Sequence, residues 1–147
     1  MVDDTPILIC YDGSEGARNA ISAAAALLVG RSAVVLNVGP LQTVAEGYAA
    51  LGSSAADLDH VIFDEALARA EAGAEVARRA GFSASARAEV DAPTWHGVVE
   101  VANDIDAAAI VLGSRGLTGV RELLEGSLSH EVAERAGRPV LIVPPPR

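Results

Sequence analysis

The sequence predicts an α/β fold, a single doubly wound sheet of five parallel strands with helices on both faces. Short apolar runs alternate with segments whose apolar residues recur three and four positions apart, in the order β-α-β-α-β-α-β-α-β. The apolar runs are mostly continuous, which is typical of strands buried on both faces of a parallel sheet. Short connections and right-handed crossovers then favour the strand order 3-2-1-4-5.

Each expected element has its own signal in the chain. The first strand runs into the turn residues Asp12, Gly13 and Ser14, and the helix after it repeats apolar residues from Ala17 to Leu28. We expect strands at residues 7–11, 33–38, 83–90, 108–112 and 140–143. We expect helices at residues 17–28, 63–77, 95–105 and 124–136.

Residues 41–60 are less regular and contain two glycines and a pair of serines. We expect an exposed excursion there, with a helical turn within it. Helical spacing returns afterwards, and it predicts a buried stripe at Phe63, Leu67, Ala70, Ala74 and Ala77.

Length and composition indicate one domain, which we take as residues 1–147, with residues 41–60 as its variable excursion. Half of the residues are hydrophobic, but the aromatic ones are one Trp, two Tyr and two Phe. Ala, Val, Leu and Ile must therefore fill the core. The sequence has no internal repeat.

Charge excludes several classes of function. The formal net charge of −9 argues against binding to nucleic acid or to an anionic membrane surface, because no basic surplus exists to displace counterions. All eleven basic residues are arginine, so the lysine of a Walker-type phosphate loop and the amine of a Schiff-base enzyme are both missing. A small anionic ligand stays open, since one helix terminus can oppose the global charge locally.

The single cysteine, Cys10, cannot form an internal disulfide, and its apolar surroundings predict a buried residue rather than a reactive thiol. His60, His96 and His130 share no metal-ligand spacing, so we expect no metal site. The N-terminus lacks the basic and apolar regions of a signal peptide, and no segment is long and apolar enough to span a membrane. We therefore expect a cytoplasmic protein.

A glycine-rich segment follows the fourth expected strand. In a doubly wound sheet the ligand crevice lies at the carboxyl ends of the strands that flank the switch point, here the first and the fourth. Gly113 and Gly116 let a ligand approach the backbone closely, and Gly126 and Ser127 open the last helix, whose N-terminal N–H groups favour an anion. With the hydroxyl of Ser129, these residues predict a phosphate cradle that needs no lysine.

The spacing Gly113-x-x-Gly116, nine residues, Gly126-Ser127 matches the G-x₂-G-x₉-G-[S/T] signature of ATP-binding universal stress proteins. Residues 7–14, 36–38, 109–116 and 137–143 also look like segments of that family, and residues 41–60 alone are uninformative. The chain thus resembles a universal stress protein of the ATP-binding subgroup. The resemblance implies an adenine-nucleotide α-hydrolase-like fold with the strand order of flavodoxin-like sheets.

The resemblance also implies a role for individual positions. Asp12 and Val38 would receive the adenine and ribose, with Val38 contributing backbone hydrogen bonds, and the glycines and serines would receive the ribose and phosphates. The positions implied to bind the nucleotide are Asp12, Val38, Leu112, Gly113, Arg115, Gly116, Gly126, Ser127, Leu128 and Ser129. Two alternatives stay open, because Asp12 could instead cap the first helix and Arg115 could pair with a surface carboxylate.

The ligand implied is ATP, AMP or another adenine nucleotide, with or without Mg²⁺. The family's last strand often pairs across a dimer axis, which implies a homodimer through the edge formed by Val140, Leu141, Ile142 and Val143.

Three functions follow from this reading. The first is a dimeric nucleotide-binding module of a bacterial stress response, which acts on a protein partner that the sequence does not identify. The second is a slow ATPase or a self-phosphorylating enzyme that uses Ser114, Ser127 or Ser129. The third is a dimeric interaction protein that works without nucleotide. The intact glycine signature favours the first, and no base or arginine finger for phosphoryl transfer is identified, so we expect no catalytic residues.

Overall fold

The computed structural model describes residues 4–28, 30–41, 55–114 and 127–147. Its elements are β1 (Ile7–Cys10), α1 (Glu15–Leu27), β2 (Ser32–Pro40), α3 (Ala55–Arg79), β3 (Ser83–Asp91), α4 (Thr94–Asp104), β4 (Ile110–Gly113), α5 (Leu128–Arg135) and β5 (Val140–Val143). The strands form one five-stranded sheet in the order β3-β2-β1-β4-β5, and every neighbouring pair is parallel. The predicted fold class and strand order are confirmed.

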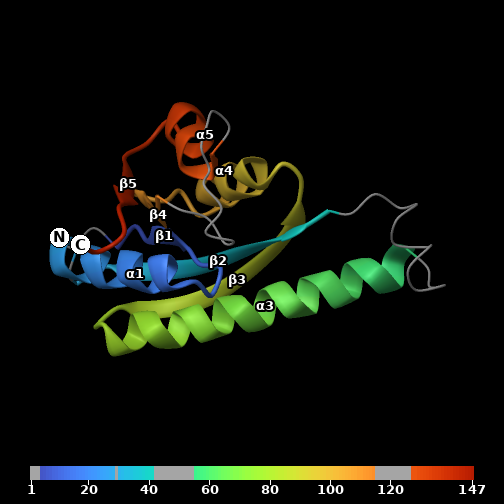
Figure 1. Cartoon of the computed structure of the whole chain (residues 1–147), viewed down its shortest axis with the longest axis horizontal. Coiled ribbons are helices and arrows are strands. Elements are labelled where there is room, and N and C mark those ends of the chain that lie inside the picture. The colour runs from blue at the N-terminus through green and yellow to red at the C-terminus, as the bar shows by residue number, and fades with distance from the viewer. Residues whose placement is uncertain (1–3, 29, 42–54, 115–126) are drawn as a thin grey trace.

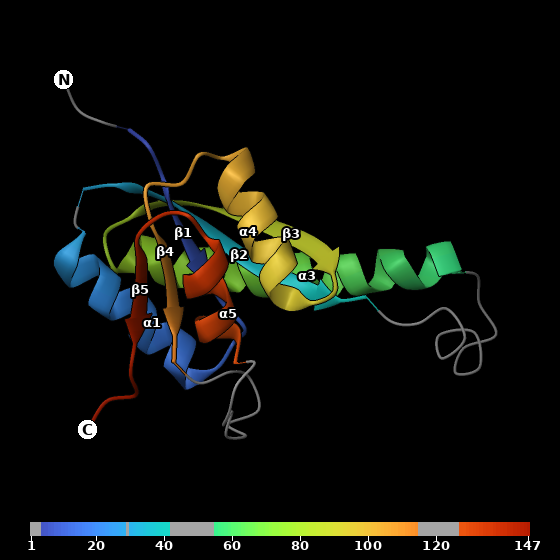
Figure 2. The same ribbon diagram turned by 90° about the horizontal axis from the view of Figure 1, so that it is seen from above.

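Two separate cores lie on the two faces of the sheet, with α4 and α5 above it and α1 and α3 below it in the view of Figure 1. Alternate residues of each strand point to opposite faces. Ile7, Ile9 and Val35 accordingly pack toward α1 and α3, whereas Leu8 and Leu36 pack toward α4 and α5. Figure 2, the view from above, shows β1 in the middle of the sheet between β2 and β4. The middle of the sheet is therefore covered on both sides.

The expectation for residues 41–60 is wrong at its C-terminal end, because α3 already begins at Ala55. Residues 42–54 lie outside the described part of the chain. The predicted stripe of α3 is also off by one position at its start, since Phe63 is 39% exposed and the buried residues there are Ile62 and Ala66. Ala70, Ala74 and Ala77 are buried as predicted.

Close packing against β2 explains the shift in that stripe. A Cβ atom at Gly39 of β2 would lie 2.7 Å from Cγ2 of Ile62, so the bare backbone of Gly39 is what gives Ile62 room. The helix buries its small residues against the sheet and leaves Phe63 on the outer side.

Among the described residues, no helix is both long and apolar enough to cross a membrane.

Candidate functional site

A cavity of about 260 Å³ opens at the carboxyl ends of β1, β2 and β4. That volume lies just under the range in which small-molecule sites usually fall, roughly 300–1,000 Å³. The sheet reverses its winding here, because the chain leaves β1 through α1 on one face and leaves β4 toward α5 on the other. The cavity therefore lies at the switch point that the sequence predicts for the ligand crevice.

The turn after β1 supplies one wall. Asp12 lines the cavity, and its Oδ1 accepts a hydrogen bond from the backbone N–H of Ser14 at 2.9 Å. Ser14 is the N-cap of α1, and its Oγ accepts from the backbone N–H of Ala17 at 3.1 Å. Asp12 is thus not the cap of the helix, and its carboxylate is held at the cavity by the turn that precedes the cap.

The end of β2 supplies a backbone edge. The C=O of Leu36 accepts from the N–H of Tyr11 on the β1 side, and the N–H of Leu41 donates to Asp91 on the β3 side. Because backbone groups of a strand alternate in direction, Val38 directs its N–H and C=O to the same side as Leu36. On that side β1 has ended at Cys10 while β2 continues to Pro40. Val38 lines the cavity, so its peptide groups face a space where no strand lies.

The third wall comes from β4 and α5. Gly113 and Ser114 line the cavity at the end of β4, and the N–H of Ser114 donates to Val143 of β5 at 2.9 Å. Leu128 and Ser129 line it from the first turn of α5. The hydroxyl-bearing Ser129 and the end of β4 therefore line the same cavity.

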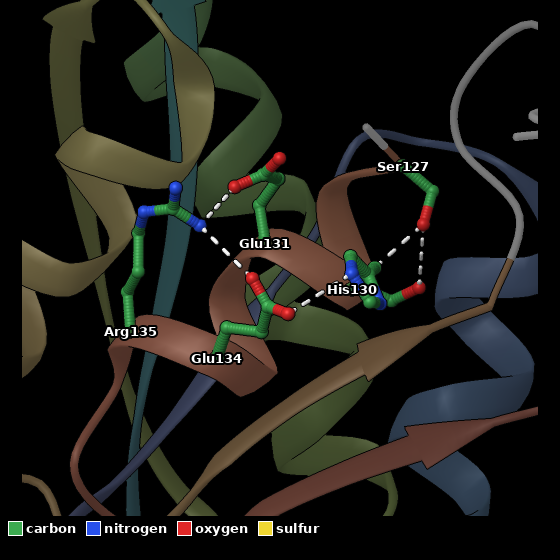
Figure 3. A network of polar contacts seen from close by, with 6 residues as sticks. Ser127, His130, Glu131, Glu134 and Arg135 are labelled. Carbon is green, nitrogen blue, oxygen red and sulfur yellow. Dashed lines mark hydrogen bonds and ion pairs between the residues drawn. The ribbon is translucent and has the colours of Figure 1, made fainter. Parts of the chain in front are cut away.

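Ser127 caps α5 rather than lining the cavity. Its Oγ accepts from the backbone N–H of His130 at 3.3 Å and lies 3.5 Å from Oγ of Ser129 (Figure 3). Further along the helix, Nε2 of His130 is 3.2 Å from Glu134, and Arg135 pairs with Glu131. These side chains form a series of polar contacts along α5, and at its N-terminal end the series includes Ser129, which lines the cavity.

The structure brings together six of the ten predicted positions. Those that line the cavity are Asp12, Val38, Leu112, Gly113, Leu128 and Ser129. Ser127 adjoins Ser129 as the helix cap. Arg115, Gly116 and Gly126 lie outside the described residues, so their predicted roles stay predictions.

Sequence reasoning missed several residues of the cavity wall. Thr94 and Val98 come from α4, and their position could not be read from the chain because it depends on how α4 packs over β2. Asn37 also lines the cavity, and the signal that could have found it is a polar residue within an apolar strand. Its side chain is 7% exposed, and Nδ2 donates to the carbonyl oxygen of Tyr11 at 2.7 Å.

The thiol of Cys10 lines the cavity as well. Burial raises the pKa of this thiol to about 12, and the negative charge of Asp12 contributes. A thiol with such a pKa stays protonated at neutral pH and is a poor nucleophile. Cys10 is therefore part of an apolar wall, but it is partly exposed rather than buried as its sequence context predicts.

The ion pair of Asp91 and His96 lies beside the site at the start of α4. Nδ1 of His96 is 2.7 Å from Oδ2 of Asp91, and this hydrogen bond raises the pKa of His96 and lowers the pKa of Asp91. In the described part of the chain, no three His, Cys, Asp or Glu side chains gather as a metal site would require.

Comparison with known proteins gives the family. The family model described as "Universal stress protein family" matches residues 5–144. This chain belongs to the universal stress protein family. A relative in Thermus aquaticus, the "Universal stress protein in QAH/OAS sulfhydrylase 3′region", is 32% identical over 142 residues, which is 93% of this chain and 96% of that protein. Universal stress protein YxiE of Bacillus subtilis is 42% identical over 48 residues, or 33% of this chain and 32% of that protein.

Solved structures of universal stress proteins have the same fold. The structure of MJ0577 from Methanocaldococcus jannaschii has a TM-score of 0.78 and 25% identity, and the match covers 99% of both chains. A universal stress protein solved in complex with cAMP has a TM-score of 0.69 and 24% identity, covering 95% of this chain and 96% of that one. The protein of Archaeoglobus fulgidus, solved with dAMP, has a TM-score of 0.64 and 24% identity, covering 95% of this chain and 97% of that one.

Proposed function

We propose that this universal stress protein binds an adenine nucleotide, ATP or AMP, in the cavity at the ends of β1, β2 and β4. The observation that carries the proposal is the backbone edge of Val38, which lines the cavity past the end of β1. A peptide N–H and C=O that face the same side match a ring nitrogen that accepts and an adjacent amino group that donates, as adenine has. Cys10, Leu36 and Val98 provide the apolar walls that a flat base needs.

The ribose and phosphates would extend from the base toward β4 and α5. Gly113 lets the chain pass close to them, and the hydroxyl of Ser129 and the N-terminus of α5 supply hydrogen-bond donors. The signature that begins at Gly113 and ends at Ser127 supports the same assignment from the sequence. Two structural neighbours were solved with cAMP and with dAMP, which are adenine nucleotides, and we extend that ligand class to this chain.

A protein-held Mg²⁺ fits the site less well than one that arrives on the nucleotide. Among the described residues that line the cavity, Asp12 is the one with a carboxylate side chain. Mg²⁺ commonly takes one or two carboxylates together with phosphate oxygens and water. We therefore propose that any such ion would arrive with the nucleotide and be held mainly by its phosphates, while Asp12 stays at the adenine and ribose end.

We propose a homodimer through β5. Among the strands that the structure describes, β5 pairs with β4 and lies at the edge of the sheet, and its Ile142 is 38% exposed. An unpaired strand edge with an exposed apolar side chain favours association with another edge. A second copy pairing along Val140 to Val143 would cover it.

Regulation rather than catalysis is the activity that we propose. Ser127, a candidate for self-phosphorylation, already accepts a hydrogen bond as the cap of α5. Slow hydrolysis would then be a by-product of binding. The module would act in the cytoplasm, and nucleotide occupancy would alter its contacts with a protein partner under stress.

Mass spectrometry of the small molecules that the purified protein releases on denaturation tests the proposed ligand, and light scattering tests the dimer. We expect an adenine nucleotide in the released fraction, or saturable uptake of ATP by protein that carries none. Phosphate release from bound ATP, followed in parallel, should be slow. Absence of both released nucleotide and uptake would contradict the proposal, and the third reading, a dimer that works without nucleotide, would replace it.

A further inference from the structure

Asn37 is a buried polar residue in a strand of otherwise mostly apolar residues, and it lines the cavity. Its Nδ2 donates to the carbonyl oxygen of Tyr11 at 2.7 Å. A carbonyl oxygen only accepts, so the nitrogen must face Tyr11, and the orientation of the amide is settled. Oδ1 is then buried, with no hydrogen-bond partner among the described residues. An unpaired buried acceptor opposes folding, so stability alone does not account for Asn37.

The bond from Asn37 replaces a step of the ladder between β1 and β2. The N–H of Tyr11 donates to Leu36 at 2.9 Å. In a regular parallel ladder, the next bond would run from the N–H of Val38 back to the carbonyl of Tyr11. Here that carbonyl accepts from the side chain of Asn37 and not from the backbone of Val38.

We infer that Asn37 is a positioning residue, whose side-chain amide holds the Tyr11 carbonyl and so keeps the peptide groups of Val38 open to the ligand. The inference rests on the proposed function and concerns how the site chooses its base. An open N–H and C=O suit adenine, which offers an acceptor ring nitrogen beside a donor amino group. Hypoxanthine offers an N–H beside a carbonyl at the same positions, which reverses the pattern. Asn37 thus favours adenine without touching it.

Backbone hydrogen exchange, measured without any ligand, tests whether Asn37 keeps the peptide groups of Val38 unpaired. In the unliganded protein, the amide of Val38 should exchange faster than the amide of Leu36, which lies within the paired length of β1 and β2. Asn37→Leu removes the side-chain donor, and the Val38 amide should then become protected as it takes over the Tyr11 carbonyl. Asn19→Leu is the matched control, because Nδ2 of Asn19 also donates to a backbone carbonyl, that of Pro144 at 3.1 Å.

Titration with ATP and with ITP, which differ at position 6 of the base, tests whether Asn37 makes the site prefer adenine. The wild type should prefer ATP. Asn37→Leu should weaken ATP binding about tenfold and lower the ATP-to-ITP affinity ratio by a similar factor, since roughly one hydrogen bond to the base is lost. Asn37→Ala, which removes the donor without added bulk, should do the same and serves if the leucine variant does not fold.

Several results would overturn the inference. An unchanged ATP-to-ITP ratio in a folded Asn37 variant, or a protected Val38 amide in the wild type, would do so and leave the proposed function standing. Failure of the wild type itself to bind ATP would overturn both. A lower ratio in Asn19→Leu would show that the effect is not specific to the cavity and would also count against Asn37.

Discussion

The ring of Tyr11 lies directly against the backbone of Gly73 on α3. A Cβ atom at Gly73 would lie 2.6 Å from Cγ and from Cδ1 of Tyr11, and 2.8 Å from Cγ1 of Val35. The missing side chain of Gly73 is therefore what lets Tyr11 fold back under the cavity, where its ring is 5% exposed. This contact joins α3 to the wall of the proposed site.

Gly73→Ala should destabilise the protein by about 1 kcal/mol or more, although the same change in an open helix stabilises by about that amount. Overpacking against Tyr11 and Val35 outweighs the gain in helix propensity. Urea unfolding measures the effect, and Glu71→Ala on the exposed side of α3 should change stability by no more than about 0.5 kcal/mol. A Gly73→Ala protein that is more stable than the wild type would contradict the contact.

Ser127 should matter mainly for stability and Ser129 mainly for nucleotide binding. Ser127→Ala removes the cap of α5 and should cost about 1 kcal/mol of stability. Ser129→Ala should leave the unfolding midpoint nearly unchanged and weaken ATP binding several-fold, because its hydroxyl lines the cavity. Equal losses of stability in the two variants, with ATP affinity kept in Ser129→Ala, would contradict this division.

The contact of Arg135 with Trp95 should stabilise the packing of α5 on α4. The guanidinium carbon of Arg135 lies 4.5 Å from the centroid of the indole ring. Arg135→Ala should destabilise by about 1 kcal/mol, because it removes this cation–π contact together with the ion pair to Glu131. Arg79→Ala is the control, since Arg79 makes an exposed ion pair with Glu75 that should contribute less than about 0.5 kcal/mol. Equal effects of the two substitutions would leave the Trp95 contact without energetic weight.

The pair of Asp91 and His96 should make stability depend on pH. The hydrogen bond to Asp91 raises the pKa of His96, so its contribution is complete below the ordinary pKa of histidine, about 6.5, and is lost as the pH rises through the folded value. The hydrogen bond from His96 lowers the pKa of Asp91, whose contribution is present above about pH 3.9 and is lost as the pH falls through its folded value. The pair therefore stabilises most between those two ordinary values.

Thermal unfolding of the wild type and of His96→Gln at low salt measures this window. The difference in melting temperature should be larger near pH 5.5 than near pH 8.5, roughly one unit below and two units above the ordinary histidine pKa. Asp91→Asn should lose the same pH dependence. A difference that does not vary with pH would show that the pair contributes nothing through its charge.

The fold and the place of the site could be predicted from local pattern. Continuous apolar runs, glycine stops and helical spacing give the order of elements along the chain. Short, right-handed crossovers then favour a strand order that places the crevice beside Asp12 and Gly113. The start of α3 was not predicted because Gly52, Ser53 and Ser54 immediately precede Ala55 and residues 55–61 show little apolar spacing. The first buried position of α3 was not predicted, because whether Ile62 or Phe63 is buried depends on which of them packs against Gly39.

The role of Asn37 could not be predicted from the chain at all. The sequence places a polar residue in a strand. Its hydrogen bond to Tyr11, however, depends on β1 ending at Cys10 while β2 continues to Pro40. The sequence assigned Val38 through resemblance, and the structure supplies the physical reason, a peptide edge past the end of a strand. Long-range register of this kind has no local signal.

The most direct test of the nucleotide site is calorimetric titration of ATP into the wild type and into Gly113→Val, with thermal unfolding of both. We expect one saturable site per chain in the wild type, and at least about a hundredfold weaker binding in a folded Gly113→Val, because the new side chain fills the gap between backbone and nucleotide. The same ATP affinity in the two proteins would show that the cavity at the ends of β1 and β4 does not hold the nucleotide.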